Sequence, residues 1–432
     1  MGRTRIILAG TVAALAATVF ALGGALGESP GAASAPDPPL GGIDATAATK
    51  TLVKSLEARV RAHPRDSRAL TLLGLAYEQR ERETGNPIYV ARADRLVRRA
   101  VRLAPRNAVA VSALASLALG RHQFRPALRL GRRALRLDRR NGAAYAIVGD
   151  ALLELGRYDE AFRIFDGLAA RKPGVAAYAR ISYGRELLGD TRGALEAMKL
   201  AESAAGGRAE PTAWTSVQLG KLEFSRGRPD LAERHFRLAL AVFPSYAHAF
   251  EGLARVEAAR GHTRRALALA RRAASQAPLP QFAATLGDLY ALAGNDARAR
   301  EQYERVHRIE RDLQAGGLRN ELEVALFDVD HGVRLRRAVT LARRARAARP
   351  SVDSDDALGW ALARAGRCGE ALHFSERALR LGTRDASKWF HRGMIERCLG
   401  HERAARAWFR RALARNPYFS LRWAAVAREY GR

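Results

Sequence analysis

The residues whose types could do chemistry gather in two short stretches, "FDVDHG" at 327–332 and "DSDD" at 353–356. Carboxylate and imidazole groups at such spacing can bind a divalent metal ion. Aspartates at the start of a helix more commonly cap it and offset its dipole, and "SVDSDDAL" stands where a helix is expected to begin. We therefore interpret both stretches as helix capping and solvated charge, and we expect neither a metal nor a cofactor.

No other stretch carries a recognisable catalytic motif. The sequence has no glycine-rich phosphate loop with lysine, no Gly-x-Ser-x-Gly elbow and no His-Glu-x-x-His zinc helix. Its two cysteines, Cys368 and Cys398, are expected toward the same edge of neighbouring units. They could form a disulfide, with two free thiols as the alternative. We expect a protein that is not an enzyme.

The elements that must position these residues come from one repeating unit. The stretch "YAIVGDALLELGRYDEAFRIFDGLAARKP" at 145–173 predicts two amphipathic helices joined by a turn. Gly149 in the first helix precedes Ala161 in the second by twelve residues, and the same spacing separates Gly220 from Ala232. Small residues at this spacing allow the two helices of a unit to cross closely.

This pattern resembles the tetratricopeptide repeat, in which an aromatic residue, Leu-Gly, Tyr, Ala, Phe and Pro recur over about 34 residues. The resemblance extends over residues 50–432. Among proteins with this repeat, the chain resembles exported bacterial ones without an assigned activity. It implies an all-α protein, a right-handed α-solenoid of about ten tetratricopeptide-like helix-turn-helix repeats. The repeats are expected over residues 46–417 and a C-terminal capping helix over 418–432.

The N-terminal segment predicts export. Arg3 and Arg5 precede an uncharged apolar run at 6–27, which is the layout of a signal peptide. The length of this run also suits a bilayer span. We predict a signal peptide or N-terminal transmembrane anchor at 1–27 and a flexible Pro/Gly/Ala linker at 28–45. The protein is then extracytoplasmic, either secreted or anchored in the cytoplasmic membrane by residues 6–27.

Charge is distributed unevenly between the two helices of a unit. The formal net charge is +29, and nearly all of the 73 basic residues are arginine. A net charge this high is typical of a protein with an anionic partner, whereas the arginine bias is typical of a GC-rich genome. Second helices such as 128–140 and 264–274 are basic, whereas first helices are often acidic. Because first helices line the concave groove in the family that the chain resembles, the resemblance implies an acidic groove and an Arg-rich convex face.

The same analogy assigns acidic and apolar side chains to a partner-binding groove. They are Glu154, Tyr183, Glu186, Trp214, Phe224, Asp288, Glu323, Phe327, Asp356, Trp360 and Met394. The alternative for the rings is that they only fill gaps between helices.

These features favour a non-enzymatic interaction scaffold of the cell envelope that binds a peptide or protein partner in its groove. The alternative function is binding of an anionic membrane or cell-wall polymer by the Arg-rich convex face. Nucleic acid is disfavoured because the basic helices carry few aromatic residues.

Overall fold

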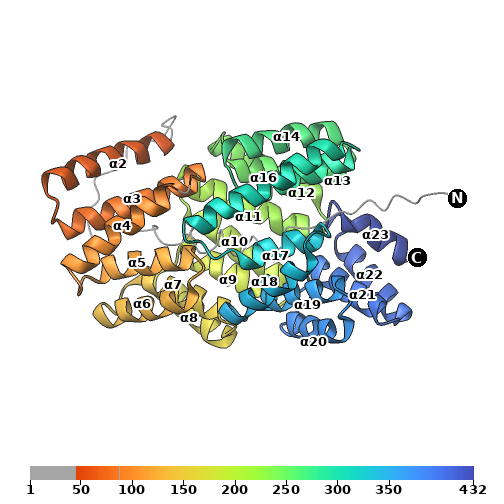
Figure 1. Ribbon diagram of the computed structural model, residues 1–432. Helices are drawn as coiled ribbons and strands as arrows, with labels where there is room; N and C mark the ends of the chain where they lie inside the picture. The colour runs from red at the N-terminus through yellow and green to blue at the C-terminus, as the bar shows by residue number, and fades with distance from the viewer. Residues whose placement is uncertain (1–44, 87) are drawn as a thin grey trace.

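The computed structural model describes residues 45–86 and 88–432, which form 22 α-helices and contain no strand (Figure 1). This confirms the predicted all-α fold. The predicted signal or anchor at 1–27 and the linker up to residue 44 lie outside the described residues. Within the described part, no helix combines the length and the apolar character needed to cross a bilayer.

Ten helix pairs follow one another, each with an inner and an outer helix. The inner helices are α3 (Ser67–Thr84), α5 (Ala108–Gly120), α7 (Gly142–Glu154), α9 (Val175–Leu187), α11 (Ala209–Ser225), α13 (Ala247–Ala259), α15 (Pro280–Leu292), α17 (Glu321–Asp330), α19 (Val352–Arg364) and α21 (Ala386–Cys398). The outer helices are α4 (Ile88–Leu103), α6 (Phe124–Leu137), α8 (Tyr158–Arg171), α10 (Thr191–Ala204), α12 (Pro229–Val242), α14 (Thr263–Gln276), α16 (Asp296–Ala315), α18 (Leu335–Ala348), α20 (Cys368–Leu379) and α22 (Glu402–Arg415). Two single helices, α2 (Ala45–Ala62) and α23 (Trp423–Tyr430), stand at the ends.

The pair α7–α8 shows why these residues form the unit. The Asn141 side chain accepts the backbone N–H of Ala144 and so caps α7. Gly156, with φ of 72°, ends the turn after α7 in the left-handed region that favours glycine. Inside the pair, a Cβ on Gly149 would lie 2.4 Å from the buried ring of Phe165. The predicted small residue is therefore required by the close approach of the two helices.

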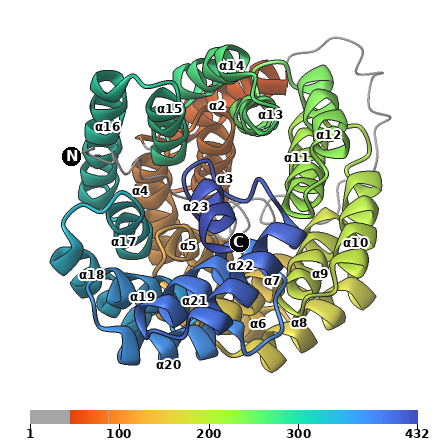
Figure 2. The same cartoon turned by 90° about the vertical axis from the view of Figure 1, so that its right-hand side faces the viewer.

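The pairs wind into a right-handed superhelix whose second turn lies against the first. Figure 2 looks along this superhelix, with odd-numbered helices such as α17 and α19 on the inside and even-numbered ones such as α18 and α20 at the rim. The turns inside early repeats pack on the loops between late repeats. We call this contact line the seam; its two sides are residues 121–122, 156–158, 189–191 and 227, and residues 319–320, 350–352, 382–385 and 415–417.

Backbone and side-chain hydrogen bonds join the two sides of the seam. The Arg319 N–H donates to the Arg121 carbonyl at 3.2 Å. The Val352 N–H donates to the Tyr158 hydroxyl at 2.7 Å. Gly156 packs so closely that a Cβ there would lie 2.5 Å from the Pro350 carbonyl oxygen. The seam therefore makes the solenoid a closed, two-layered ring, a feature that the repeat pattern does not contain.

The C-terminal cap is shorter than the sequence predicts. Helix α23 spans Trp423–Tyr430, because residues 417–422 form turns instead of its first part. In one of these turns the Ser420 hydroxyl accepts the N–H groups of Arg422 and Trp423. Helix α23 lies near the centre of the ring in Figure 2. The Arg422 guanidinium lies 3.6 Å from the Asp288 carboxylate of α15, so the cap contacts the inner wall.

Candidate functional site

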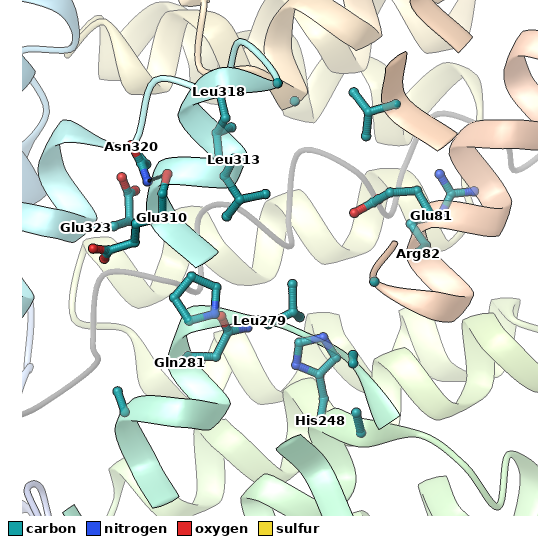
Figure 3. A pocket seen from close by; sticks show the side chains of 18 of the residues that line it. Glu81, Arg82, His248, Leu279, Gln281, Glu310, Leu313, Leu318, Asn320 and Glu323 are labelled. Atoms are coloured by element: carbon teal, nitrogen blue, oxygen red, sulfur yellow. Dashed lines mark hydrogen bonds between the residues drawn. The ribbon is translucent and has the colours of Figure 1, made fainter. Parts of the chain in front are cut away.

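The inner helices enclose a cavity of about 250 Å³, which we call the larger cavity. Its lining comes from the ends of α3, α5, α13 and α16 and from α11, α15 and α17. Figure 3 shows Glu81 and Arg82 on one side of it and Glu310 and Glu323 on the other. Apolar groups such as Leu313 lie between these walls. The cavity therefore offers an apolar middle between two polar walls.

The larger cavity is acidic, although the protein as a whole is strongly basic. Its lining contains two arginines, Arg82 and Arg121, and three histidines. The carboxyl groups outnumber these arginines; they belong to Glu78, Glu81, Glu83, Glu210, Glu310, Glu323 and Asp330. Such a lining attracts cationic groups.

Burial shifts the pKa values of several of these groups. Removal from water raises the pKa of both Glu78 and Glu81 to about 7, and the attraction of Arg82 only partly opposes it. Burial also raises the pKa of Glu210 and of Glu310. The pKa of His248 falls to about 3, because burial and the neighbouring Lys221 both oppose its protonation. A bound cation would lower the pKa values of the carboxyl groups and favour their ionised form.

A second cavity, of about 230 Å³, adjoins the first and is called the smaller cavity. His248 and Gln281 line both, so the two cavities are neighbours, and we call the pair the inner channel. The smaller cavity is of mixed charge. Lys388 there donates to Asp353 at 2.8 Å and contacts Asp385 at 3.2 Å.

The structure brings six of the predicted groove residues to this inner channel. Trp214, Glu323 and Phe327 line the larger cavity. Tyr183, Glu186 and Phe224 line the smaller one. Although the prediction treated them as one continuous groove, the seam and the cap divide and cover the concave face.

The other predicted residues lie in neither cavity. They are Glu154, Asp288, Asp356, Trp360 and Met394. Trp360, expected as an exposed anchor, is completely buried and donates its indole N–H to Asp330 at 2.9 Å. Phe327, Trp360 and Met394 occupy successive inner helices as expected, but only Phe327 reaches a cavity. The expectation of exposed rings is thus wrong for Trp360, because its ring packs against His391 of α21 and Trp423 of the cap helix α23.

Several acidic residues of the inner helices are ion-paired. Both carboxylate oxygens of Asp150 accept from Arg180, at 2.8 and 2.6 Å. The Arg349 guanidinium lies 3.3 Å from both Glu154 and Glu323, which belong to different turns of the superhelix. Burial without such partners would be costly, so the Asp150 pair belongs to the packing of α7 on α9 and the Arg349 pairs belong to the packing of the seam.

The remaining predicted positions also have packing roles. Asp356 lies 3.0 Å from the His391 imidazole. Asp288 accepts from the Tyr303 hydroxyl at 3.0 Å and lies 3.0 Å from His331. Within the described residues, no group of three side chains is arranged to hold a metal ion.

The stretch "DSDD" caps less than the sequence predicts. Ser351 is the N-cap of α19, and its hydroxyl accepts the Ser354 N–H. Asp355 instead pairs with three arginines, at 2.6 Å to Arg346, 2.9 Å to Arg380 and 3.3 Å to Arg377. The two cysteines, Cys368 at the start of α20 and Cys398 at the end of α21, are joined by a disulfide with a Cα–Cα distance of 5.8 Å.

Sequence reasoning missed five acidic residues of the larger cavity: Glu78, Glu81, Glu83, Glu210 and Glu310. The three helices that carry them are unusually long. Helix α3 has 18 residues, α11 has 17 and α16 has 20, whereas most helices of the repeats have 13 or 14. The extra turns of α3 and α16 project Glu81 and Glu310 into the cavity. The only sequence signal was the greater length of these two units.

The ten stacked helix pairs define an α-solenoid of the helical-repeat class. A model of the tetratricopeptide repeat matches residues 112–176 and 217–279, which include the unit at 145–173. The chain is a tetratricopeptide repeat protein.

Solved structures with distant similarity are also repeat proteins. The human IFIT1 dimer with PPP-AAAA is 18% identical, with 77% of this chain and 78% of that chain covered and a TM-score of 0.48. YrrB, described as a TPR protein with an unusual peptide-binding site, is 19% identical over 46% of this chain and 96% of its own, with a TM-score of 0.30. None of the curated proteins matches the chain. Similarities this distant carry no information about what the chain binds.

Proposed function

We propose that the protein is a non-enzymatic scaffold of the cell envelope that binds a basic segment of a protein partner in its inner channel. The repeat fold itself suggests protein or peptide binding. The proposal adds the charge of the ligand and the place where it binds.

The observation that carries the proposal is the acidic lining of the larger cavity in a protein of net charge +29. Because the chain is strongly basic, an average part of its surface is expected to be basic, and the acidic lining departs from this composition. The carboxyl groups of Glu81 and Glu210 belong to different repeats yet line the same cavity. Among the described residues, no arginine forms an ion pair within 4.0 Å with either carboxylate. Lysine or arginine side chains of a peptide would supply the missing positive charge, and the leucines of the lining would contact its apolar residues.

The test is a binding measurement with two synthetic peptides of equal length. One decapeptide alternates Lys and Leu, and the other alternates Glu and Leu; both carry a fluorescent label for anisotropy. The Lys peptide should bind, and the Glu→Gln changes at Glu81 and Glu210 together should weaken it about 30-fold, since each removes an attraction of roughly 1 kcal/mol.

The matched control is Glu304→Gln, which removes the same charge from an exposed side chain of α16. It should leave the dissociation constant unchanged. Equal binding of the two peptides, or equal weakening by Glu304→Gln, would exclude the acidic channel as the binding site.

The envelope location is a separate part of the proposal. It is motivated by the basic start and the apolar run at 6–27. Mass spectrometry of the mature chain tests it. A start near Glu28 indicates a secreted protein, retention of residues 6–27 in a membrane fraction indicates an anchored one, and a full-length protein in the cytoplasm contradicts the proposal.

A further inference from the structure

The outer rim of the ring carries a basic surface that is assembled across the seam. Helix α6 has five arginines and α18 has five, and neither helix contains an acidic residue. The two helices are about 200 residues apart in sequence, yet they meet at the rim. The Arg125 guanidinium at the start of α6 donates to the Ala347 carbonyl near the end of α18, at 3.4 Å.

Many of these arginines have no carboxylate partner within the described residues. Arg125 and Arg133 bond only to backbone carbonyl oxygens, those of Ala347 and Pro105. Four more are exposed and form no ion pair: Arg129, Arg136, Arg336 and Arg344. We call these six residues the rim patch. Charges of one sign at such a junction repel one another, so an anionic partner would relieve a cost that the closed ring carries.

The arginine-rich composition of the whole chain does not by itself account for the rim patch. Across the same seam, α8 and α20 carry both signs of charge, including Glu160 and Glu370, which pair with Arg157 and Arg367. Along this part of the seam, uncompensated charge therefore lies at the junction of α6 with α18 and not at that of α8 with α20. Guanidinium groups suit phosphate oxygens, to which they can donate two hydrogen bonds at once.

We propose that the rim patch docks the protein on an anionic phospholipid bilayer, with arginines of both superhelical turns on the phosphodiester headgroups. The predicted anchor at 6–27 favours a bilayer over other polyanions. Residues 28–44 can span at most about 60 Å at roughly 3.5 Å per residue, and α6 belongs to the second repeat after them. An anchored chain therefore keeps the rim patch within reach of its own membrane. Aromatic rings on which bases could stack are scarce in α6 and α18, which disfavours a nucleic acid.

The test is co-sedimentation with vesicles of residues 45–432, which contain the full solenoid. Vesicles of phosphatidylcholine with 30% phosphatidylglycerol should bind it, and vesicles of phosphatidylcholine alone should not. Each arginine near such a surface strengthens partition about fivefold. The double variant Arg129→Glu/Arg344→Glu has one change on each side of the seam. Because two arginines are lost at about fivefold each, it should lower the partition coefficient by a factor of at least about 25.

The matched control is Arg264→Glu/Arg265→Glu on α14, which changes the net charge equally. Helix α14 is also free of acidic residues, both substituted arginines are exposed, and the helix lies on the far side of the ring from α6 in Figures 1 and 2. This variant should bind vesicles nearly as well as the original chain. Circular dichroism and the thermal midpoint of both variants establish that they fold.

Three outcomes would overturn the proposal. Equal losses in the two variants mean that net charge, not the rim patch, attracts the protein. Equal binding to neutral vesicles means that headgroup charge is irrelevant. Retention on isolated wall polymer or RNA without binding to anionic vesicles assigns the rim patch to a different polyanion.

Discussion

At the scale of single residues, Glu78 is a carboxyl group that the fold removes almost entirely from water. It is 3% exposed, and its one described hydrogen bond comes from the Ser116 hydroxyl at 3.3 Å. Burial raises its pKa from 4.5 to about 7. The folded state therefore holds a proton on Glu78 at pH values where the unfolded chain has released it.

This shift predicts a pH dependence of stability. A raised carboxyl pKa contributes stability below the unfolded pKa, and this contribution is lost as the pH rises through the folded value. Between pH 4.5 and 7 the free energy of unfolding should fall by about 1.4 kcal/mol per pH unit for this one group. Glu78→Gln removes the ionisation, so urea unfolding should show the variant more stable than the original chain at pH 8 and similar at pH 5. A pH profile as steep as that of the original chain would show that Glu78 is not the group responsible.

At the scale of the helix pair, stability depends on glycines where two helices cross. A Cβ on Gly149 would collide with the Phe165 ring, which is 1% exposed and cannot move without disturbing its neighbours. In contrast, a Cβ on Gly369 in α20 would meet nothing within 4 Å. Both glycines lie in helices, so the pair separates packing from helix propensity.

We expect opposite effects of the same substitution at these two positions. Gly149→Ala should lower the free energy of unfolding by about 1–3 kcal/mol through overpacking. Gly369→Ala should leave it unchanged or raise it by up to about 1 kcal/mol, because alanine favours the helix. Urea denaturation followed by circular dichroism measures both. Equal destabilisation by the two changes would contradict the close crossing of α7 and α8.

At the scale of the whole molecule, the seam turns an open solenoid into a closed ring. Arg349 lies at its centre, is 3% exposed and bridges Glu154 of α7 to Glu323 of α17. Burial raises the pKa of Glu154 to about 7 in spite of this pairing. Loss of the arginine would leave two buried carboxyl groups close together in adjacent turns.

Arg349→Met should therefore destabilise the seam by about 3–5 kcal/mol at neutral pH. Because the effect comes from unpaired carboxyl groups, further changes of Glu154 and Glu323 to Gln should restore much of the loss. Hydrogen exchange of the amides of Arg319 and Val352, which bond across the seam, reports the opening directly. Unchanged exchange at these amides in Arg349→Met would mean that the ion pairs do not hold the two turns together.

The sequence by itself determined the repeat and its class. Gly149, Ala161 and their equivalents follow from the close crossing of two helices, which is a local requirement written into every unit. The difference between acidic inner and basic outer helices could also be predicted from the sequence, because the charge of each helix follows from its own residues. The pairing of Cys368 with Cys398 could be anticipated as one of two alternatives, because both lie at the edges of neighbouring units.

Only the tertiary structure decided which of these side chains are accessible. Superhelical winding is the sum of small rotations between repeats, and no local pattern specifies where the second turn meets the first. For this reason the sequence could not show that Trp360 and Glu154 are covered, that Glu81 and Glu310 face one cavity, or that α6 meets α18. The repeat was determined residue by residue, whereas the channel and the rim patch depend on contacts between segments that are far apart in the chain.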